Sequence, residues 1–261
     1  MKIKKLFALM ALAAIFLPGC TKDKVTKLEE QIIGKWMKAD INGQPAPTNE
    51  KVVITFVSDD KAYINASIDH QEGGYPWDVS IEQDVSISGN TITLTCHPDE
   101  SRTIVDENTI TAINDKEFTT NRKITITIDG SEVVTRQFVD RFVKVTDDYT
   151  QAVLGIWEGH VTSEQSEYDD YLEHRWQYNT DGTYVYYNKD GNNWIPNPNN
   201  TLNEYFVDGN LLCMRWVNNG AEYREWWEIA SIEDNVMSWT ALRKKADGTT
   251  YTASFSMVKV Q

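Results

Sequence analysis

The sequence predicts an all-β protein made of two tandem antiparallel β-barrels, with two β-sandwiches as the alternative. Three observations support this fold class. Apolar and polar residues alternate strictly in stretches such as 91–96 and 124–128, which places one strand face inward and the other outward. Asp-Gly and Asn-Gly pairs, which favour tight hairpin turns, recur at short intervals. The chain also matches itself at a nearly constant offset.

This internal repeat predicts the domain organisation. Five short motifs occur twice in the same order, 115 to 121 residues apart. The pairs are Gly34-Lys35-Trp36 with Gly155-Ile156-Trp157, Asp60-x-x-Tyr63 with Asp181-x-x-Tyr184, Gly89-Asn90 with Gly209-Asn210, Ile113-x-Asp115 with Ile232-x-Asp234, and Val143-Lys144-Val145 with Val258-Lys259-Val260. We therefore expect one domain over 28–146 and a second over 147–261. The segments Lys24–Ile33 and Asp147–Leu154 precede the two Gly-x-Trp motifs, and each is expected to form a short helix.

The N-terminal segment has the composition of a secretion signal. Three lysines precede an apolar run of twelve residues from Leu6 to Leu17. A membrane-spanning helix needs about 20 apolar residues, so this run fits the core of a signal peptide over 1–19. The alternative of a helix that stays in the membrane is disfavoured by this length.

The end of this segment, Leu17-Pro18-Gly19-Cys20, resembles the lipobox of bacterial lipoproteins. The resemblance implies cleavage before Cys20, lipidation of its sulfur, attachment to the membrane through that lipid, and a tether over 20–27. Thr21 after the cysteine resembles the sorting pattern for the bacterial outer membrane, with the periplasmic or cell-surface face left open. An ordinary secretory signal that contains a cysteine is the alternative.

A second resemblance rests on the repeated Gly-x-Trp motif. A short helical turn, Gly-x-Trp at the start of the first strand and a hairpin-rich meander together resemble a lipocalin-like (calycin) domain. With the lipobox, the pattern is similar to lipocalin-like lipoproteins of Bacteroidetes. This resemblance implies barrels in which Trp36 and Trp157 pack across the closed end as structural residues.

Charge and cysteine content exclude several classes of function. The chain has 25 basic and 39 acidic residues, a net charge of −14, so we expect no nucleic-acid partner. Removing 1–19 would leave 22 − 39 = −17. Cys96 and Cys213 lie in strand-like segments and are expected to be small buried hydrophobes rather than a disulfide or reactive thiols. No metal site and no cofactor are expected.

The aromatic residues point to the second domain as the binding domain. Seven of the nine tryptophans and nine of the twelve tyrosines follow residue 150. Aromatic walls with polar tips suit apolar or saccharide ligands, so a lipid, a bile salt or a glycan is expected, although a bulky aromatic core would give the same composition. The predicted ligand-binding residues are Trp194, Trp176, Tyr178, Tyr184, Tyr186 and Trp227.

Two tryptophans stand out by position. Alternation places Trp227 inside the barrel and Trp226 on the opposite, charged face, where the other domain, a ligand or solvent must meet it. An exposed Trp226 would mark a surface patch, which supports the alternative function of an interaction or assembly module with closed barrels and an envelope protein partner. Trp194 lies in the Asn- and Pro-rich segment 189–200, which is expected to be a loop over the barrel mouth.

Motifs for catalysis are scarce, so a non-enzymatic protein is expected. His70, His97, His160 and His174 form neither HxH nor HExxH, and no nucleophile elbow or phosphate loop occurs. Glu173-His174 follows Asp169-Asp170. Together these residues could hold a metal or act in acid–base chemistry, but a solvated acidic segment is favoured. The segment 188–192 is expected to be a hairpin turn rather than a calcium loop.

Overall fold

The protein is described by a computed structural model that covers residues 27–65, 77, 80–166, 168, 173–198 and 200–260. The predicted signal peptide, the lipidation site Cys20, His70 and the Asp169-Asp170 pair lie outside the described residues. Within the described part, no helix has the length and apolar character needed to cross a membrane.

Almost all regular structure is antiparallel strand. A first sheet runs from Gly34 to Lys144 and a second from Gly155 to Val260. The elements are α1 (Leu28–Gln31), β1 (Gly34–Ile41), β2 (Gln44–Pro45), η1 (Thr48–Glu50), β3 (Val53–Phe56), β4 (Lys61–Asn65), β5 (Ile81–Ser88), β6 (Thr91–Cys96), β7 (Arg102–Ile113), β8 (Glu117–Ile128), β9 (Ser131–Lys144), β10 (Gly155–Val161), β11 (His174–Tyr178), β12 (Tyr184–Asp190), β13 (Asn193–Pro196), β14 (Asn200–Asp208), β15 (Leu211–Asn218), β16 (Ala221–Glu233), β17 (Val236–Lys244) and β18 (Thr250–Val260).

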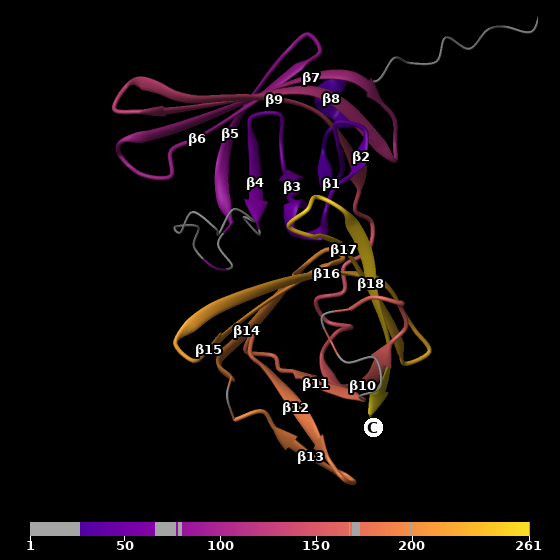
Figure 1. The fold of residues 1–261 in the computed structure, drawn as a ribbon. Helices are drawn as coiled ribbons and strands as arrows, with labels where there is room; N and C mark the ends of the chain where they lie inside the picture. Colours follow the sequence, from indigo (N-terminus) through magenta and orange to yellow (C-terminus); the bar gives the residue numbers. More distant parts are fainter. Residues whose placement is uncertain are drawn as a thin grey trace, which may run out of the picture.

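The first sheet closes into an up-and-down barrel. Its strands follow the order β1-β3-β4-β5-β6-β7-β8-β9, with the short β2 beside β1. The last strand returns to the first, because β9 pairs with β1 from Trp36–Lys144 to Ile41–Asp140. This closure, visible at the top of Figure 1, confirms the barrel and excludes the sandwich for this sheet.

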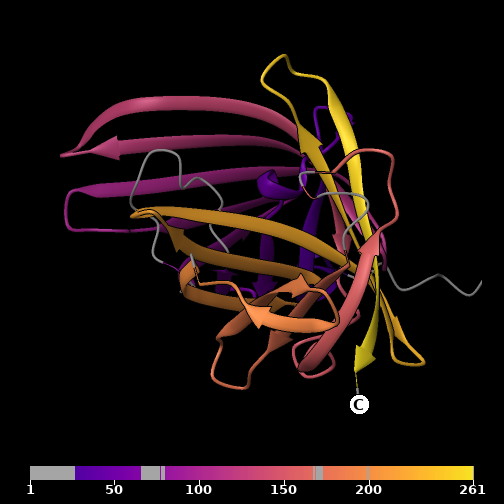
Figure 2. The same cartoon turned by 60° about the horizontal axis from the view of Figure 1, so that its bottom comes forward.

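The second sheet is curled in the same way, but its two edge strands do not pair with each other to close a barrel. Its order is β13-β12-β11-β10-β18-β17-β16-β15-β14, which leaves β13 and β14 as the two edges. Among the described residues, β14 meets the β12 side through one isolated bridge between Thr183 and Glu204. The predicted all-β class with two barrel-like domains is confirmed, and the second domain is a curled half-barrel rather than a closed barrel; Figure 2 turns it toward the viewer in orange and yellow.

The extra strand β13 explains the incomplete closure. Residues 193–196 fold back on β12 and pair with its residues 187–190. Each strand edge can pair with one neighbour, so β13 occupies the edge of β12 that β14 would need for a full ladder. The turn between them, at Gly191 and Asn192, confirms the hairpin interpretation of segment 188–192.

The two Gly-x-Trp motifs have the same local structure in both sheets. Trp36 and Trp157 are fully buried, and their indole N–H groups donate to the carbonyls of Ile32 (2.6 Å) and Val153 (2.7 Å). The carbonyl of Ile32 follows α1. The second expected helix is absent: 150–153 form a turn, which supplies the Val153 carbonyl without a helix.

A lysine covers each of these tryptophans. Lys144 Nζ lies 5.0 Å from the Trp36 ring centroid and Lys259 Nζ lies 5.1 Å from that of Trp157. Gly155 has a φ of +114°, and a Cβ there would lie 2.9 Å from Lys259 Cε, so this position needs glycine for its conformation and for space. The repeated Gly-x-Trp and Val-Lys-Val motifs are thus parts of one packing unit.

The first barrel carries a buried charge network in its interior. Arg122 donates to both oxygens of Asp106, at 2.7 to 2.9 Å, and to Asp140 Oδ2 at 3.1 Å. Asp106 and Asp140 are 5% and 1% exposed. Burial, reinforced by the charge of Arg122, lowers the pKa of nearby Lys38 to about 8. No local pattern in the sequence indicates this network.

The two sheets share a small apolar cluster. Met37 and Val53, on the outer face of the first barrel, pack with Phe206, Cys213 and Trp226 from the second sheet. Trp226 is 3% exposed, so the predicted surface patch is wrong, and the first barrel provides the cover for this residue. Cys96 and Cys213 are both buried, as expected.

Polar contacts surround the shared cluster. Lys35 Nζ lies 2.5 Å from Asp208 Oδ1, and Lys51 Nζ lies 2.7 Å from Glu228 Oε1. The amide of Leu242 donates to the hydroxyl of Thr48 at 2.8 Å. These contacts fix the orientation of the first barrel on the outer face of β14 to β17.

Candidate ligand cavity in the second sheet

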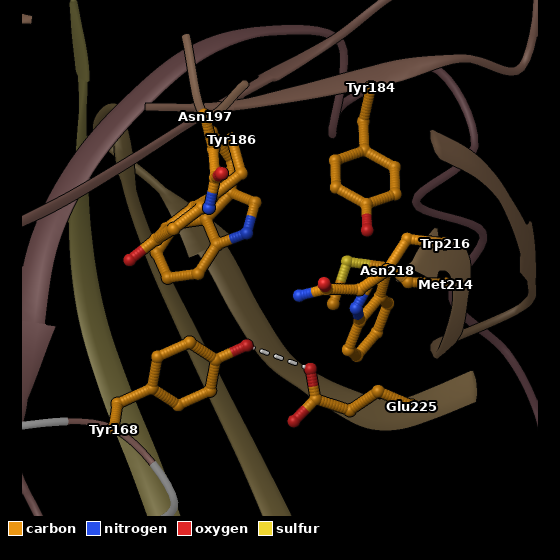
Figure 3. Close-up of a pocket in the computed structure, with 9 residues that line it drawn as sticks. Tyr168, Tyr184, Tyr186, Asn197, Met214, Trp216, Asn218 and Glu225 are labelled. Atoms are coloured by element: carbon orange, nitrogen blue, oxygen red, sulfur yellow. Dashed lines mark hydrogen bonds between the residues drawn. The ribbon is translucent and has the colours of Figure 1, made fainter. Parts of the chain in front are cut away.

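The second sheet encloses a cavity of about 210 Å³. Strands β11, β12, β15 and β16 supply most of its wall, and the loop between β10 and β11 adds one tyrosine. The lining residues are Tyr168, Trp176, Tyr184, Tyr186, Asn197, Met214, Trp216, Asn218 and Glu225 (Figure 3). The first barrel differs, since the space between Ile54, Leu94 and Phe118 measures about 10 Å³. Of these two cavities the one in the second sheet is the larger, so it is the candidate site for a ligand.

Aromatic rings form most of the cavity wall. The Trp176 ring centroid lies 5.2 Å from that of Tyr186 and 5.8 Å from that of Tyr168. Across the cavity, Trp216 stacks on Tyr223 with centroids 5.7 Å apart and an interplanar angle of 15°. Figure 3 shows the hydroxyl of Tyr184 directed into the space between these rings. Such a wall favours a ligand with a flat or methyl-rich apolar surface.

One carboxylate, that of Glu225, completes the wall. The Tyr168 hydroxyl donates to Glu225 Oε2 at 2.9 Å, and Arg243 Nη2 lies 3.0 Å from Glu225 Oε1. Arg243 also donates to the carbonyl of Trp226 at 2.8 Å and stacks on the Trp227 ring at 4.6 Å. These contacts hold Glu225 in one position.

The phenol groups around Glu225 respond to its charge. Burial raises the pKa of Tyr168, Tyr184 and Tyr186, and the negative charge of Glu225 raises each of these pKa values further. All three phenols are thus held neutral, as hydroxyl groups able to donate or accept hydrogen bonds.

One polar atom of the wall has no partner within the described part of the chain. Asn218 Oδ1 is shielded from solvent and accepts no hydrogen bond from any described residue. A buried acceptor without a donor costs about 1–3 kcal/mol, which a ligand that donates to it would recover.

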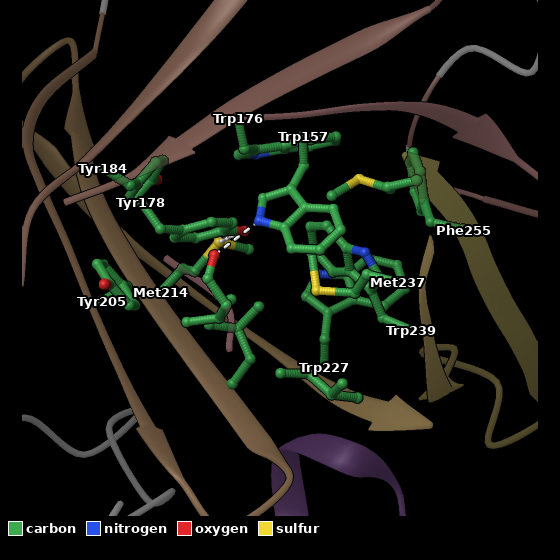
Figure 4. Close-up of a cluster of buried hydrophobic side chains, with 14 of the residues drawn as sticks. Trp157, Trp176, Tyr178, Tyr184, Tyr205, Met214, Trp227, Met237, Trp239 and Phe255 are labelled. Atoms are coloured by element: carbon green, nitrogen blue, oxygen red, sulfur yellow. Dashed lines mark hydrogen bonds between the residues drawn. The ribbon is translucent and has the colours of Figure 1, made fainter. Parts of the chain in front are cut away.

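Half of the predicted ligand-binding residues line the cavity. Trp176, Tyr184 and Tyr186 do so. Tyr178 and Trp227 belong instead to the aromatic core behind it, where Trp227 packs against Trp239 and Phe255 at 5.2 and 5.5 Å (Figure 4). The bulky-core alternative therefore describes part of the aromatic excess.

Trp194 is placed differently from the expectation. It lies in β13 rather than in a loop, opposite Lys189 of β12. Its ring covers the guanidinium of Arg175 at 4.6 Å, and Arg175 points to the side opposite its cavity-lining neighbour Trp176. Trp194 is thus on the outer face of the sheet, and its prediction as a residue over the barrel mouth is wrong.

His174 is buried, so the prediction that it lies in a solvated acidic segment is wrong. It is 2% exposed, its Nδ1 lies 2.9 Å from the Tyr186 hydroxyl, and its ring stacks on Trp176 at 5.6 Å. His174 therefore supports the cavity wall from behind. Its neighbour Glu173 forms an ion pair with Lys189.

Sequence reasoning missed several lining residues that alternation could have identified. Glu225 shares its strand face with Trp227, so the pattern that placed Trp227 inside also places Glu225 inside. Met214, Trp216 and Asn218 likewise share one face of β15. Tyr168 comes from a loop, and no periodicity marks it. Across the described residues, no group of three or more His, Cys, Asp or Glu side chains could hold a metal ion.

Comparisons with known proteins find solved structures that resemble this chain at low sequence identity. No protein family matches the sequence, and no curated protein matches it. A solved protein of unknown function from the DUF3598 family of Nostoc punctiforme is 10% identical, with a TM-score of 0.24, over 89% of this chain and 97% of that one. A double mutant of transferrin binding protein B from Haemophilus parasuis is 9% identical, with a TM-score of 0.23, over 81% of this chain and 53% of that one. The TM-scores are low, so the fold assignment depends on the strand pairing described above.

Proposed function

We propose that this chain is a non-catalytic, lipid-anchored envelope protein that binds a compact ligand in the cavity of the second sheet. The observation that carries the proposal is the 210 Å³ cavity itself, which is walled by aromatic rings with a few polar tips. It lies where β12 and β14 are not fully paired, so the sheet leaves room there.

The size and lining of the cavity limit the ligand. Sites for drug-sized molecules occupy about 300–1,000 Å³, so this cavity holds about one ring or one small group. Trp176 and Trp216 offer faces for an apolar or sugar ring, and Asn197 and Asn218 offer amide groups at its edge. A saccharide unit or a small apolar group suits the cavity better than an entire bile salt.

The cellular location is proposed from the N-terminal sequence. The lipobox-like segment ending at Cys20 and the lipocalin-like pattern support a lipoprotein of a Bacteroidetes-type outer membrane, facing either the periplasm or the cell surface. The alternative of an assembly module with Trp226 as an exposed patch loses its main support, because Trp226 is buried between the two sheets.

Replacing Trp216 with alanine is expected to weaken ligand binding about tenfold or more, because truncating a central aromatic contact costs about 2 kcal/mol. The measurement is a tryptophan-fluorescence titration of residues 21–261 with monosaccharides, disaccharides, fatty acids, bile salts and short aromatic acids. Trp194→Ala is the matched control, since Trp194 lies on the outer face and its loss should leave the affinity unchanged. A panel that gives no saturable response, or a response that Trp194→Ala abolishes and Trp216→Ala retains, would contradict the cavity proposal.

Replacing Cys20 with alanine is expected to abolish lipid attachment, because the thioether requires the cysteine sulfur. Cells grown with an alkyne-labelled fatty acid would show a labelled, membrane-bound protein for the unmodified chain and an unlabelled one for Cys20→Ala. Cys96→Ala is the control. Cys96 is a buried free cysteine within the first barrel, so this variant should still be labelled. Equal labelling of Cys20→Ala and the unmodified chain would refute the lipoprotein assignment.

A further inference from the structure

The lining of the cavity is negatively charged. Among the described lining residues, Glu225 is the sole ionisable side chain other than the tyrosines. Its partner Arg243 is not part of the lining, because its guanidinium stacks on Trp227 and donates to the Trp226 carbonyl. The carboxylate therefore borders the cavity while the balancing cation lies behind it.

The rings around Glu225 supply groups that can stabilise a cation. Tyr168, Trp176, Tyr184, Tyr186 and Trp216 surround one small space, which Figure 3 shows bounded by Glu225 on one side and the phenols of Tyr184 and Tyr186 on the other. Aromatic faces carry negative potential, and a desolvated cation within about 6 Å of a ring centroid gains about 2 kcal/mol. Five rings and a carboxylate are more than an apolar group requires.

Two further observations also favour a cation over an anion in the cavity. The negative charge of Glu225 adds to burial in raising the pKa of Tyr168, Tyr184 and Tyr186, in line with an anionic group at the cavity wall. The Asn218 Oδ1 atom, shielded and without a partner among the described residues, accepts hydrogen bonds and repels anions. The whole chain, at −14, also attracts cations from solution.

We infer that the group bound in the cavity is an ammonium cation, held by the aromatic rings and by the carboxylate of Glu225. The inference rests on the proposed function and narrows its ligand class. Such a group occurs on a methylated amine such as choline and on an amino sugar such as glucosamine. The shared chemistry is a compact organic cation with an apolar surface.

Pairs of cationic and neutral probes of equal shape test the inference. Choline is compared with 3,3-dimethyl-1-butanol, and glucosamine with glucose, by isothermal titration of residues 21–261. At least one cation is expected to bind about tenfold or more tightly than its neutral counterpart, because the neutral probe gains neither the cation–π nor the Coulomb interaction. Choline binding alone would identify a methylated ammonium as the source, and glucosamine binding alone an amino sugar.

Glu225→Gln tests the role of the carboxylate, because it keeps the shape of the side chain and removes its charge. Cation binding should fall about tenfold to a hundredfold, while binding of any neutral probe should stay the same. Glu228→Gln is the control, since Glu228 pairs with Lys51 on the opposite face of β16. If Glu225→Gln does not fold, the probe pairs on the unmodified protein still decide.

Two results would overturn the inference. Equal or tighter binding of the neutral probes would show that the cavity takes uncharged ligands; the proposed function would then stand without the charge assignment. Failure of both choline and glucosamine to bind would also reject the assignment of an ammonium cation. A silent response across the wider saccharide and apolar panel, in addition, would reject the proposed function itself.

Discussion

Replacing Arg122 with methionine is expected to lower the free energy of unfolding by about 3–5 kcal/mol, because it leaves two buried carboxylates without their cation. Arg122 donates four hydrogen bonds to Asp106 and Asp140 inside the first barrel. Asp140 Oδ1 already lacks a hydrogen-bond partner among the described residues, and the pKa of the nearby Lys38 is itself lowered to about 8 by burial, so Lys38 is a poor substitute for the guanidinium. Urea denaturation followed by circular dichroism at pH 7 measures the loss.

The neighbouring residue offers a matched control. Lys123 pairs with Glu107 at 3.2 Å on the same two strands, but its side chain points outward, and both partners are nearly half exposed. Exposed ion pairs contribute about 0–1 kcal/mol, so Lys123→Met should change stability little. Similar losses for the two variants would show that the interior network is not desolvated as the structure indicates.

Replacing Trp226 with alanine is expected to cost about 3–5 kcal/mol, the usual range for deleting a buried tryptophan side chain. The loss has a second effect, because Trp226 belongs to the cluster shared by both sheets. Without it, the first barrel and the second sheet should unfold in two separate transitions. Differential scanning calorimetry measures both the fall in the melting temperature and the separation into two unfolding transitions.

Trp194→Ala is again the control, since it removes the same side chain from the outer face of β12 and β13. Its effect should stay within about 1 kcal/mol. A single, unshifted transition for Trp226→Ala would mean that the two sheets are joined by the surrounding polar contacts alone, such as Lys35–Asp208 and Lys51–Glu228.

The sequence was sufficient for the strand architecture, because strands, hairpins and strand faces follow local patterns. Alternation placed Trp227 inside the second sheet and Trp226 outside it, and both positions agree with the structure. Pairing between distant strands has no such local signal. The competition of β13 and β14 for one edge of β12 depends on tertiary context, so the opening in the second sheet could not be predicted.

Part of the aromatic lining of the candidate site could be predicted from the sequence. Trp176, Tyr184 and Tyr186 were identified from composition and alternation, whereas Glu225 was passed over because acidic residues are assumed to face solvent. Trp194 shows the opposite error: the Asn- and Pro-rich surroundings predicted a loop, but a two-residue turn brought it into a strand. Tyr168 lies in a loop, where only the folded chain determines what a side chain touches.

The unpaired stretch between β12 and β14 has a consequence for how a ligand could be held. A barrel closed all around admits a molecule only through its end, and the molecule must then fit inside entirely. Here the wall itself is interrupted beside Tyr184 and Tyr186, which line the cavity from β12. The 210 Å³ limit then applies to the end group alone, and the rest of a longer molecule, such as a glycan chain or a lipid headgroup still seated in its bilayer, can remain outside.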